Sequence, residues 1–204
     1  MVWQPEDMHE LKRAAAFQAA ILFVCVCLAW SVELVDRLAY GGSLERYGIH
    51  PRDLASLWGI FLAPLLHVGW VHLGANTVPF VILGWLVMLR GLSDFAVVTG
   101  VAILVGGLGV WLLGAPNSVH VGASGLIFGY LGYLLARGYF ERSLWAVLLG
   151  GAAMVLYGGV LWGLLPGRPG ISWEGHLFGF VGGVAAARLL VPARRAGQTM
   201  TVIV

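Results

Sequence analysis

The chain has 204 residues, of which 59% are hydrophobic and only 11% are charged, with a formal net charge of +2. A soluble domain is typically about a quarter charged, so this composition excludes an ordinary water-soluble protein and predicts an integral membrane one. The small net charge gives no basis for nucleic-acid binding. Length and composition therefore predict one all-α domain in the lipid bilayer, without a separate soluble catalytic module.

Six segments are apolar and long enough to cross a hydrocarbon core of ~30 Å at about 1.5 Å per residue. They are residues 14–35, 70–89, 95–113, 122–139, 144–165 and 173–191. We expect a six-helix domain over 14–191, between an N-terminal segment at 1–13 and a tail at 192–204. Glu33 and Asp36, at the far end of the first span, are expected to reach the lipid headgroups.

The longest connection, residues 37–69, combines turn-forming residues with an apolar stretch at 54–66 that is too short to span a bilayer. This stretch predicts an interfacial or re-entrant piece, with Trp58 and Phe61 at headgroup level. Cys25 and Cys27 lie two apart on the first predicted helix, so they can neither pair nor share a metal. No zinc-binding spacing is present, and we expect neither a metal nor a cofactor.

An even number of spans places both termini on one side, and the positive-inside rule predicts which side. The terminus side has eight basic residues: Lys12, Arg13, Arg90, Arg137, Arg142, Arg188, Arg194 and Arg195. The other side has four: Arg37, Arg46, Arg52 and Arg168. Both termini are therefore expected to be cytoplasmic. One lysine against eleven arginines suggests a bacterial plasma membrane.

Three of the predicted spans begin on the outer side, and each carries polar residues near its start: His72 and Asn76, then Ser124, then His176. Polar side chains are costly in a span unless they are paired or functional, so four at one depth indicate a water-accessible site. A serine in a glycine-rich helix is by itself most often a small packing residue. With the other polar residues at the same depth, Ser124 can be a nucleophile with His176 as its base. His72 and Asn76, spaced i and i+4, can donate hydrogen bonds to an oxyanion.

Glu174 lies on nearly the opposite side of its helix from His176, so we predict a Ser–His dyad rather than a triad. Small-residue stripes in the fourth and sixth spans would let two backbones approach closely. They are Gly122, Gly125, Gly129 and Gly132 in one span and Gly179 and Gly183 in the other. If the stripes face each other, Ser124 and His176 come within hydrogen-bond reach.

Three motifs stand in order on the second, fourth and sixth spans. They are His67-x4-His72-x3-Asn76, Gly122-Ala123-Ser124-Gly125 and Gly175-His176-x2-Gly179-x3-Gly183. In this combination the chain resembles the rhomboid family of intramembrane serine proteases, in its minimal six-span form. The resemblance implies Ser124 as nucleophile, His176 as general base, and His72, Asn76 and the Ser124 backbone N–H as oxyanion hole. It further implies that Gly122 and Gly125 let the backbones fit there, and that His67 supports loop packing or water retention.

The chain departs from the family pattern in two places. The first loop lacks the Trp-Arg pair of many members and has Leu57-Trp58-Gly59 instead. Phe128 stands where some members have a tyrosine that stacks on the catalytic histidine; it can pack against His176 but has no hydroxyl. His120 matches no motif position and is interpreted as a loop residue near the entrance of the site.

The resemblance implies a serine endopeptidase that cuts other membrane proteins near the outer ends of their transmembrane segments. Its active site would open to the outer face, and substrates would approach laterally, past the fifth span and the loop 166–172. Two alternatives remain open. One is a non-catalytic rhomboid-like protein that binds membrane helices, and the other is a small transporter or channel, although no inverted repeat supports it.

Overall fold

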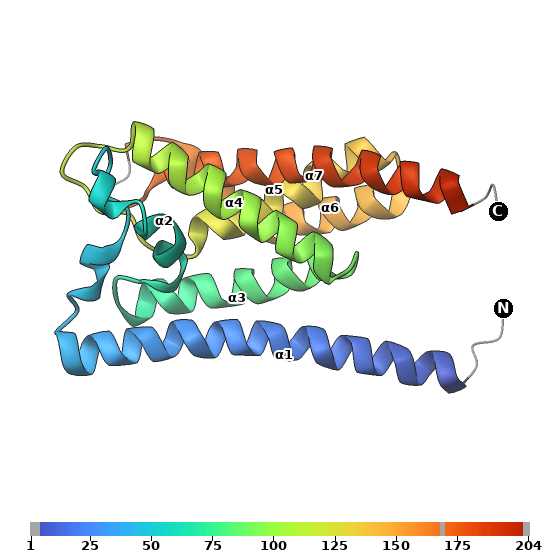
Figure 1. Ribbon diagram of the computed structural model, residues 1–204, viewed down its shortest axis with the longest axis horizontal. Coiled ribbons are helices and arrows are strands. Elements are labelled where there is room, and N and C mark those ends of the chain that lie inside the picture. Colours follow the sequence, from blue (N-terminus) through green and yellow to red (C-terminus); the bar gives the residue numbers. More distant parts are fainter. Residues whose placement is uncertain (1–4, 168–169, 202–204) are drawn as a thin grey trace.

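The computed structural model describes residues 5–167 and 170–201 (Figure 1). Parts of three predicted segments lie outside the described residues: 1–4 of the N-terminal segment, 202–204 of the tail, and Arg168 and Pro169 of the loop 166–172. Of residues 191–201, which include Arg194 and Arg195, only the backbone is described.

The described chain is all-helical, with no strand in it and one isolated bridge between Ile49 and His120. The α-helices are α1 (Pro5–Val35), α2 (Gly59–Leu62), α3 (Gly69–Met88), α4 (Leu92–Leu113), α5 (Ser124–Glu141), α6 (Leu144–Tyr157) and α7 (Trp173–Thr201). Short turns complete the list: a π-helical turn η1 (Asp36–Tyr40) and the 3-10 turns η2 (Leu44–Tyr47), η3 (Leu54–Ser56), η4 (Ala63–Leu65) and η5 (Gly158–Leu164). The all-α prediction is therefore confirmed.

The long helices alternate in direction along the chain, and the start of α1 and the end of α7 lie at the same end of the bundle (Figure 1). The opposite end holds the long loop with α2 and the first turns of α3, α5 and α7. Because those three helices begin there, residues near their N-termini lie at one level of the molecule.

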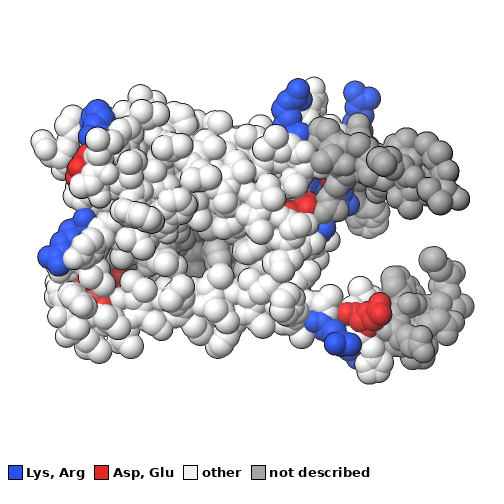
Figure 2. All heavy atoms as spheres, viewed as in Figure 1, with Lys and Arg blue, Asp and Glu red and all other residues white. Residues whose placement is uncertain are grey.

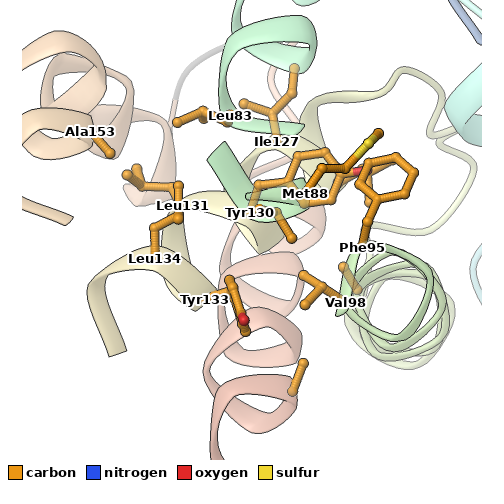
Figure 3. Packing of buried hydrophobic residues seen from close by; sticks show 14 of the residues in the cluster. Leu83, Met88, Phe95, Val98, Ile127, Tyr130, Leu131, Tyr133, Leu134 and Ala153 are labelled. Atoms are coloured by element: carbon orange, nitrogen blue, oxygen red, sulfur yellow. The ribbon is translucent and has the colours of Figure 1, made fainter. Parts of the chain in front are cut away.

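Helix α5 forms the centre of the bundle. It packs most extensively against α7, and also against α6, α4 and α3. All of its residues from Leu126 to Leu134 are buried. Figure 3 shows side chains of α5 enclosed by side chains from neighbouring helices, namely Leu83 and Met88 of α3, Phe95 and Val98 of α4, and Ala153 of α6. A segment buried on every side is held rigidly, which suits a helix that positions a reacting group.

Four helical segments are long and apolar enough to cross a membrane: Met8–Tyr40, Gly69–Met88, Leu92–Leu113 and Leu144–Leu164. Side chains of Lys, Arg, Asp and Glu gather near the two ends of the molecule and leave an uncharged band between them on the face in Figure 2. This pattern is that of an integral membrane protein. Helices α5 and α7 are less apolar because both carry glycines, site residues and charged groups.

One expectation about the end of the first span was wrong. Glu33 and Asp36 do not reach the headgroups, since they are only 1% and 2% exposed. Glu33 is ion-paired with Arg37 at 2.8 Å, and the Asp36 carboxylate accepts a hydrogen bond from the Leu44 backbone N–H at 2.9 Å. A buried carboxylate needs such partners, so these contacts fold the first loop back onto the end of α1.

Helix α7 also continues past Val191, where the sixth span was expected to end, to Thr201. A proline costs an interior helix one hydrogen bond and usually kinks or ends it, which is why Pro192 predicted a stop. The residues after it, Ala193-Arg194-Arg195-Ala196, are strong helix formers, and they favour continuation on the polar side of the bilayer.

Candidate functional site

Ser124 is the first residue of α5, and the loop before it is tightly fixed. Gly122 has a φ of 112°, a conformation that residues with a side chain rarely adopt, and its N–H donates to the Ala63 carbonyl at 2.8 Å. A Cβ atom at Gly122 would lie 2.8 Å from His72 Nε2. Only glycine therefore brings this loop against α3 and presents Ser124 with the free N–H groups of a helix start.

The first turn of α7 holds His176. Ser172 precedes this helix, and its carbonyl accepts the His176 backbone N–H at 3.1 Å. Below this turn, α7 and α5 meet backbone to backbone, since a Cβ atom built at Gly179 would overlap the Gly125 carbonyl and one at Gly183 would overlap the Gly129 carbonyl. The two glycine stripes thus face each other, and they bring the starts of α5 and α7 together.

The Ser124 hydroxyl and the His176 ring are in hydrogen-bond contact, with 2.8 Å between Oγ and Nε2. The other ring nitrogen, Nδ1, lies 3.0 Å from the Gly163 carbonyl oxygen in η5. A carbonyl can only accept, so Nδ1 carries the proton and Nε2 is left as an acceptor for the serine O–H. Phe128 stacks on the imidazole, with ring centroids 4.2 Å apart and planes 11° apart, and so fixes its tilt.

Helix α3 contributes His72 and Asn76 to the same site. The Val68 backbone N–H donates to His72 Nδ1 at 3.3 Å, so Nδ1 is the acceptor and Nε2 carries the proton. Asn76 is buried, and its Nδ2 has no hydrogen-bond partner among the described residues. The site therefore contains two side-chain donors, His72 Nε2–H and the Asn76 amide, that remain available to an incoming oxygen.

His67 lies behind this constellation and is 2% exposed. Its Nε2 accepts the Ala123 backbone N–H at 3.4 Å, and its ring meets that of His72 edge to face at 5.1 Å. Burial, with a smaller effect of the neighbouring His72, lowers the pKa of His67 to about 4, so the ring is neutral at pH 7. A neutral His67 can accept from the residue directly before Ser124, which ties the first loop to the start of α5.

Ser124 and His176 line a cavity of about 730 Å³. Its wall is built from α3, the loop before α5, the start of α5, η5 and the segment before α7, and it includes His72 and Asn76. A second, apolar cavity of about 240 Å³ lies between α1, α3, α4 and α5, and neither Ser124 nor His176 lines it. The larger cavity reaches both Ser124 and His176, so it can bring a substrate to the serine.

Comparison with known proteins gives the family of the chain. The sequence profile of the Rhomboid domain matches residues 54–193, more than half of the chain. The chain belongs to the rhomboid family. An uncharacterized protein of Mycobacterium tuberculosis is 47% identical over 180 residues, which cover 84% of this chain and 75% of the relative. An uncharacterized protein of Mycobacterium leprae is 45% identical over 201 residues, covering 95% of this chain and 79% of the relative.

A more distant relative in the rhomboid family has a functional name. The Bacillus subtilis protein named "Putative rhomboid protease YdcA" is 30% identical over 136 residues, which cover 66% of this chain and 67% of that protein. Rhomboids are generally intramembrane serine proteases, and membership in the family accounts for the membrane and protease character that the sequence indicated.

Sequence reasoning missed Gly163 and Ser172 at this rhomboid site, and it placed His120 near the entrance of the site without naming a partner for it. Gly163 contributes only a carbonyl, and it belongs to a glycine-rich segment with no motif. Ser172 and His120 hydrogen-bond to each other at 2.6 Å, although 52 positions separate them in the chain. Glu174 is buried and makes no hydrogen bond to His176 among the described residues, and the Ser–His dyad stays a prediction. Contacts of this kind leave no periodic or spaced pattern in a sequence.

Proposed function

We propose that this rhomboid is an active intramembrane serine endopeptidase in which Ser124 is the nucleophile and His176 the general base. The observation that carries the proposal is the 2.8 Å contact between Ser124 Oγ and His176 Nε2, combined with the Gly163 carbonyl on Nδ1. This pairing supports the tautomer that a general base needs, because the nitrogen facing the serine is unprotonated. No carboxylate is required, since the carbonyl orients the ring in its place.

In the proposed reaction, Ser124 Oγ attacks the carbonyl carbon of the scissile amide while His176 Nε2 takes the hydroxyl proton. The carbonyl oxygen becomes an oxyanion, held by the Ser124 backbone N–H, His72 Nε2–H and the Asn76 amide. His176 then passes its proton to the leaving amine, and an acyl-enzyme on Ser124 remains. A water molecule, deprotonated by His176, hydrolyses this ester and restores the serine.

The unpartnered Asn76 Nδ2 supports its role in the oxyanion hole. A buried donor without a partner costs free energy in the resting enzyme, and that cost is recovered when the oxyanion forms. This is the differential stabilisation that accelerates a reaction, since the donor interacts more strongly with the transition state than with the resting site.

We further propose that α1, α3, α4, α5, α6 and α7 form six spans, with both termini cytoplasmic and the site at the outer side of a bacterial plasma membrane. Its substrates would be transmembrane proteins cut near the outer ends of their spans. A helix hides its carbonyls in hydrogen bonds, so the substrate must unwind before its amide reaches Ser124. Access past η5 and the segment before α7 is supported by their place in the wall of the large cavity. The exposed side chains of Trp58 and Phe61 support contact of the first loop with lipid.

The test is labelling of the purified protein in detergent with a fluorophosphonate, which phosphonylates activated serines with loss of fluoride. We expect Ser124→Ala and His176→Ala each to abolish labelling, and each to abolish cleavage of a generic single-span substrate in liposomes. Ser143→Ala is the matched control, because Ser143 precedes α6 and its side chain makes no capping hydrogen bond. Label that persists in Ser124→Ala would overturn the assignment.

A non-catalytic rhomboid that binds membrane helices would give a different result. It would show no label in the wild type but would still retain the single-span protein in a pull-down, and Ser124→Ala would leave that retention unchanged. Cleavage that disappears together with labelling distinguishes the protease from this binder and from a transporter.

A further inference from the structure

His120 joins two loops at the entrance of the site. It lies four residues before Ser124, and its ring is hydrogen-bonded on both sides, with Nδ1 2.6 Å from Ser172 Oγ and Nε2 2.7 Å from Ser118 Oγ. Its backbone is paired in both directions with Ile49 of the first loop, at 3.0 Å each. His120 therefore connects the first loop, the loop before α5 and the segment that leads into α7.

The hydrogen bonds determine which way the protons point. The Ser118 hydroxyl donates to the Ala115 carbonyl at 2.6 Å, so it accepts from His120 Nε2–H. In a neutral ring Nδ1 is then an acceptor, and the Ser172 O–H donates to it. Burial lowers the pKa of His120, which favours this neutral ring, while Glu174 and His50 are the titratable groups that act on it electrostatically.

Ser172 connects His120 to the first turn of α7. Its Oγ accepts the Gly175 backbone N–H at 3.3 Å, and its carbonyl accepts the His176 N–H at 3.1 Å. Ser172 is thus a helix cap, and its hydroxyl can accept from Gly175 while it donates to His120. His176 lies within the turn that this cap closes.

We propose that His120 is a positioning residue, which orients Ser172 and thereby sets the first turn of α7 and the place of the His176 ring opposite Ser124. The inference rests on the proposed proteolytic function and adds a residue to its machinery. Among the described residues, His120 makes no hydrogen bond to Ser124 or His176, so we infer that it acts through Ser172. Its space is closely filled, since a Cβ atom at Gly114 would lie 3.1 Å from His120 Nε2.

The test measures the rate of fluorophosphonate labelling and the kcat of cleavage per active site, with active sites counted by labelling to completion. His120→Phe keeps a flat ring but removes both hydrogen bonds, and Ser172→Ala removes the hydroxyl. We expect each to lower kcat by roughly ten- to hundred-fold, the range that follows from small displacements of a catalytic group, with KM little changed. His120→Asn, which keeps an acceptor near the position of Nδ1, and Ser172→Thr, which keeps the hydroxyl, should recover most of the loss.

The double variant His120→Phe/Ser172→Ala should be no slower than the slower single variant, because both changes break one connection. The matched control is His50→Phe, since within the described part of the chain the His50 ring hydrogen-bonds to the Arg46 carbonyl alone, inside the first loop. It should retain the wild-type kcat. Losses that multiply in the double variant, or a His120→Phe kcat within two-fold of wild type, would refute the positioning role.

Hydrogen exchange gives a readout that needs no catalysis. Amides of residues 173–176 should exchange faster in His120→Phe than in wild type, while those at the start of α3 should not change. Faster exchange in a protein that is never labelled would refute the protease and leave the structural connection standing. Unchanged exchange in a labelled protein would refute the connection alone.

Discussion

His176 and His72 have the same side chain but opposite proposed roles, and one backbone group at each ring determines which nitrogen carries the proton. A carbonyl, that of Gly163, occupies Nδ1 of His176 and leaves Nε2 as a proton acceptor. An amide, that of Val68, occupies Nδ1 of His72 and leaves Nε2 as a proton donor. The two imidazoles therefore have the tautomers that the proposed base and the proposed oxyanion donor need, because a carbonyl and an N–H select opposite tautomers.

The Gly163 carbonyl should be sensitive to a single methyl group. A Cβ atom at Gly163 would lie 2.8 Å from His176 Nδ1, so Gly163→Ala must move either η5 or the imidazole. We expect kcat to fall by about ten- to hundred-fold, because the base loses its orientation. The control is Gly159→Ala in the same 3-10 turn, where a Cβ atom meets nothing within 4 Å. Equal kcat values for the two variants would contradict the orienting role of Gly163.

His67 should make the stability of the protein sensitive to acid. Its pKa is about 4 in the folded protein against an ordinary 6.5, so the unfolded chain binds the extra proton first as the pH falls. The contribution of His67 to stability is complete above pH 6.5 and is lost as the pH drops toward 4. The loss should reach about 2 kcal/mol by about pH 5, at ~1.4 kcal/mol per pKa unit.

The measurement is chemical unfolding in detergent micelles at several pH values, for the wild type and for His67→Asn. All titratable groups except His67 are the same in the two proteins. The difference between their plots of unfolding free energy against pH therefore isolates the contribution of His67. The variant should lose less stability on acidification. Parallel slopes would show that His67 is not held neutral by its surroundings.

At the scale of the helices, the contact of α5 with α7 determines whether a site exists. Small residues allow the two backbones to touch, and in a membrane such close packing is a main source of helix association. The Gly125–Gly179 and Gly129–Gly183 contacts lie along the same line, directly below Ser124 and His176. A larger residue at any of these glycines would act as a spacer between the two helices. It would increase the distance between Ser124 and His176 and loosen the packing of the core.

Gly179→Ala inserts such a spacer, because its Cβ atom would overlap the Gly125 carbonyl. We expect a loss of roughly 1–3 kcal/mol in unfolding free energy, as for other overpacked cores, together with loss of labelling at temperatures where the variant is still folded. Gly100→Ala in α4 is the matched control, since a Cβ atom there meets nothing within 4 Å. Thermal unfolding and fluorophosphonate labelling of the same samples measure both effects. Labelling at the wild-type rate in folded Gly179→Ala would contradict the argument.

For the whole molecule, the alternating helices place the starts of α3, α5 and α7 at one end and the described ends of the chain at the other (Figure 1). Charged side chains mark both ends, and the band between them is uncharged on the face shown in Figure 2. From the distribution of basic residues, we predict that the end with the site is the outer one.

This orientation can be tested with single cysteines in a background of Cys25→Ser and Cys27→Ser. Ala55→Cys lies on the exposed first loop and His9→Cys on the exposed start of α1, at opposite ends of the bundle. A membrane-impermeant maleimide should label only the Ala55 variant in intact cells and both variants after lysis. Label on the His9 variant alone would reverse the predicted topology.

Motif spacing predicted the members of the site because the chemistry restricts residue types. Ser124, His176, His72 and Asn76 were all selected from the sequence, and the structure brings them together. Their catalytic roles remain predictions. The prediction for Glu33 and Asp36 was wrong because a hydropathy pattern locates the end of a span but does not show which groups lie close enough to pair with a carboxylate there.

The sequence by itself determined the class of the protein: an all-helical membrane chain of the rhomboid family with polar groups at one level. The length of apolar segments, the distribution of charge and the spacing of glycines are local properties, so they can be read directly from the amino-acid sequence. Only the tertiary structure determined the protonation pattern of the site and the connections around it. The Gly163 carbonyl on His176 and the contact of His120 with Ser172 depend on where distant backbones pass one another. Any residue can supply a carbonyl, and a hydroxyl finds its partner only after the helices have packed.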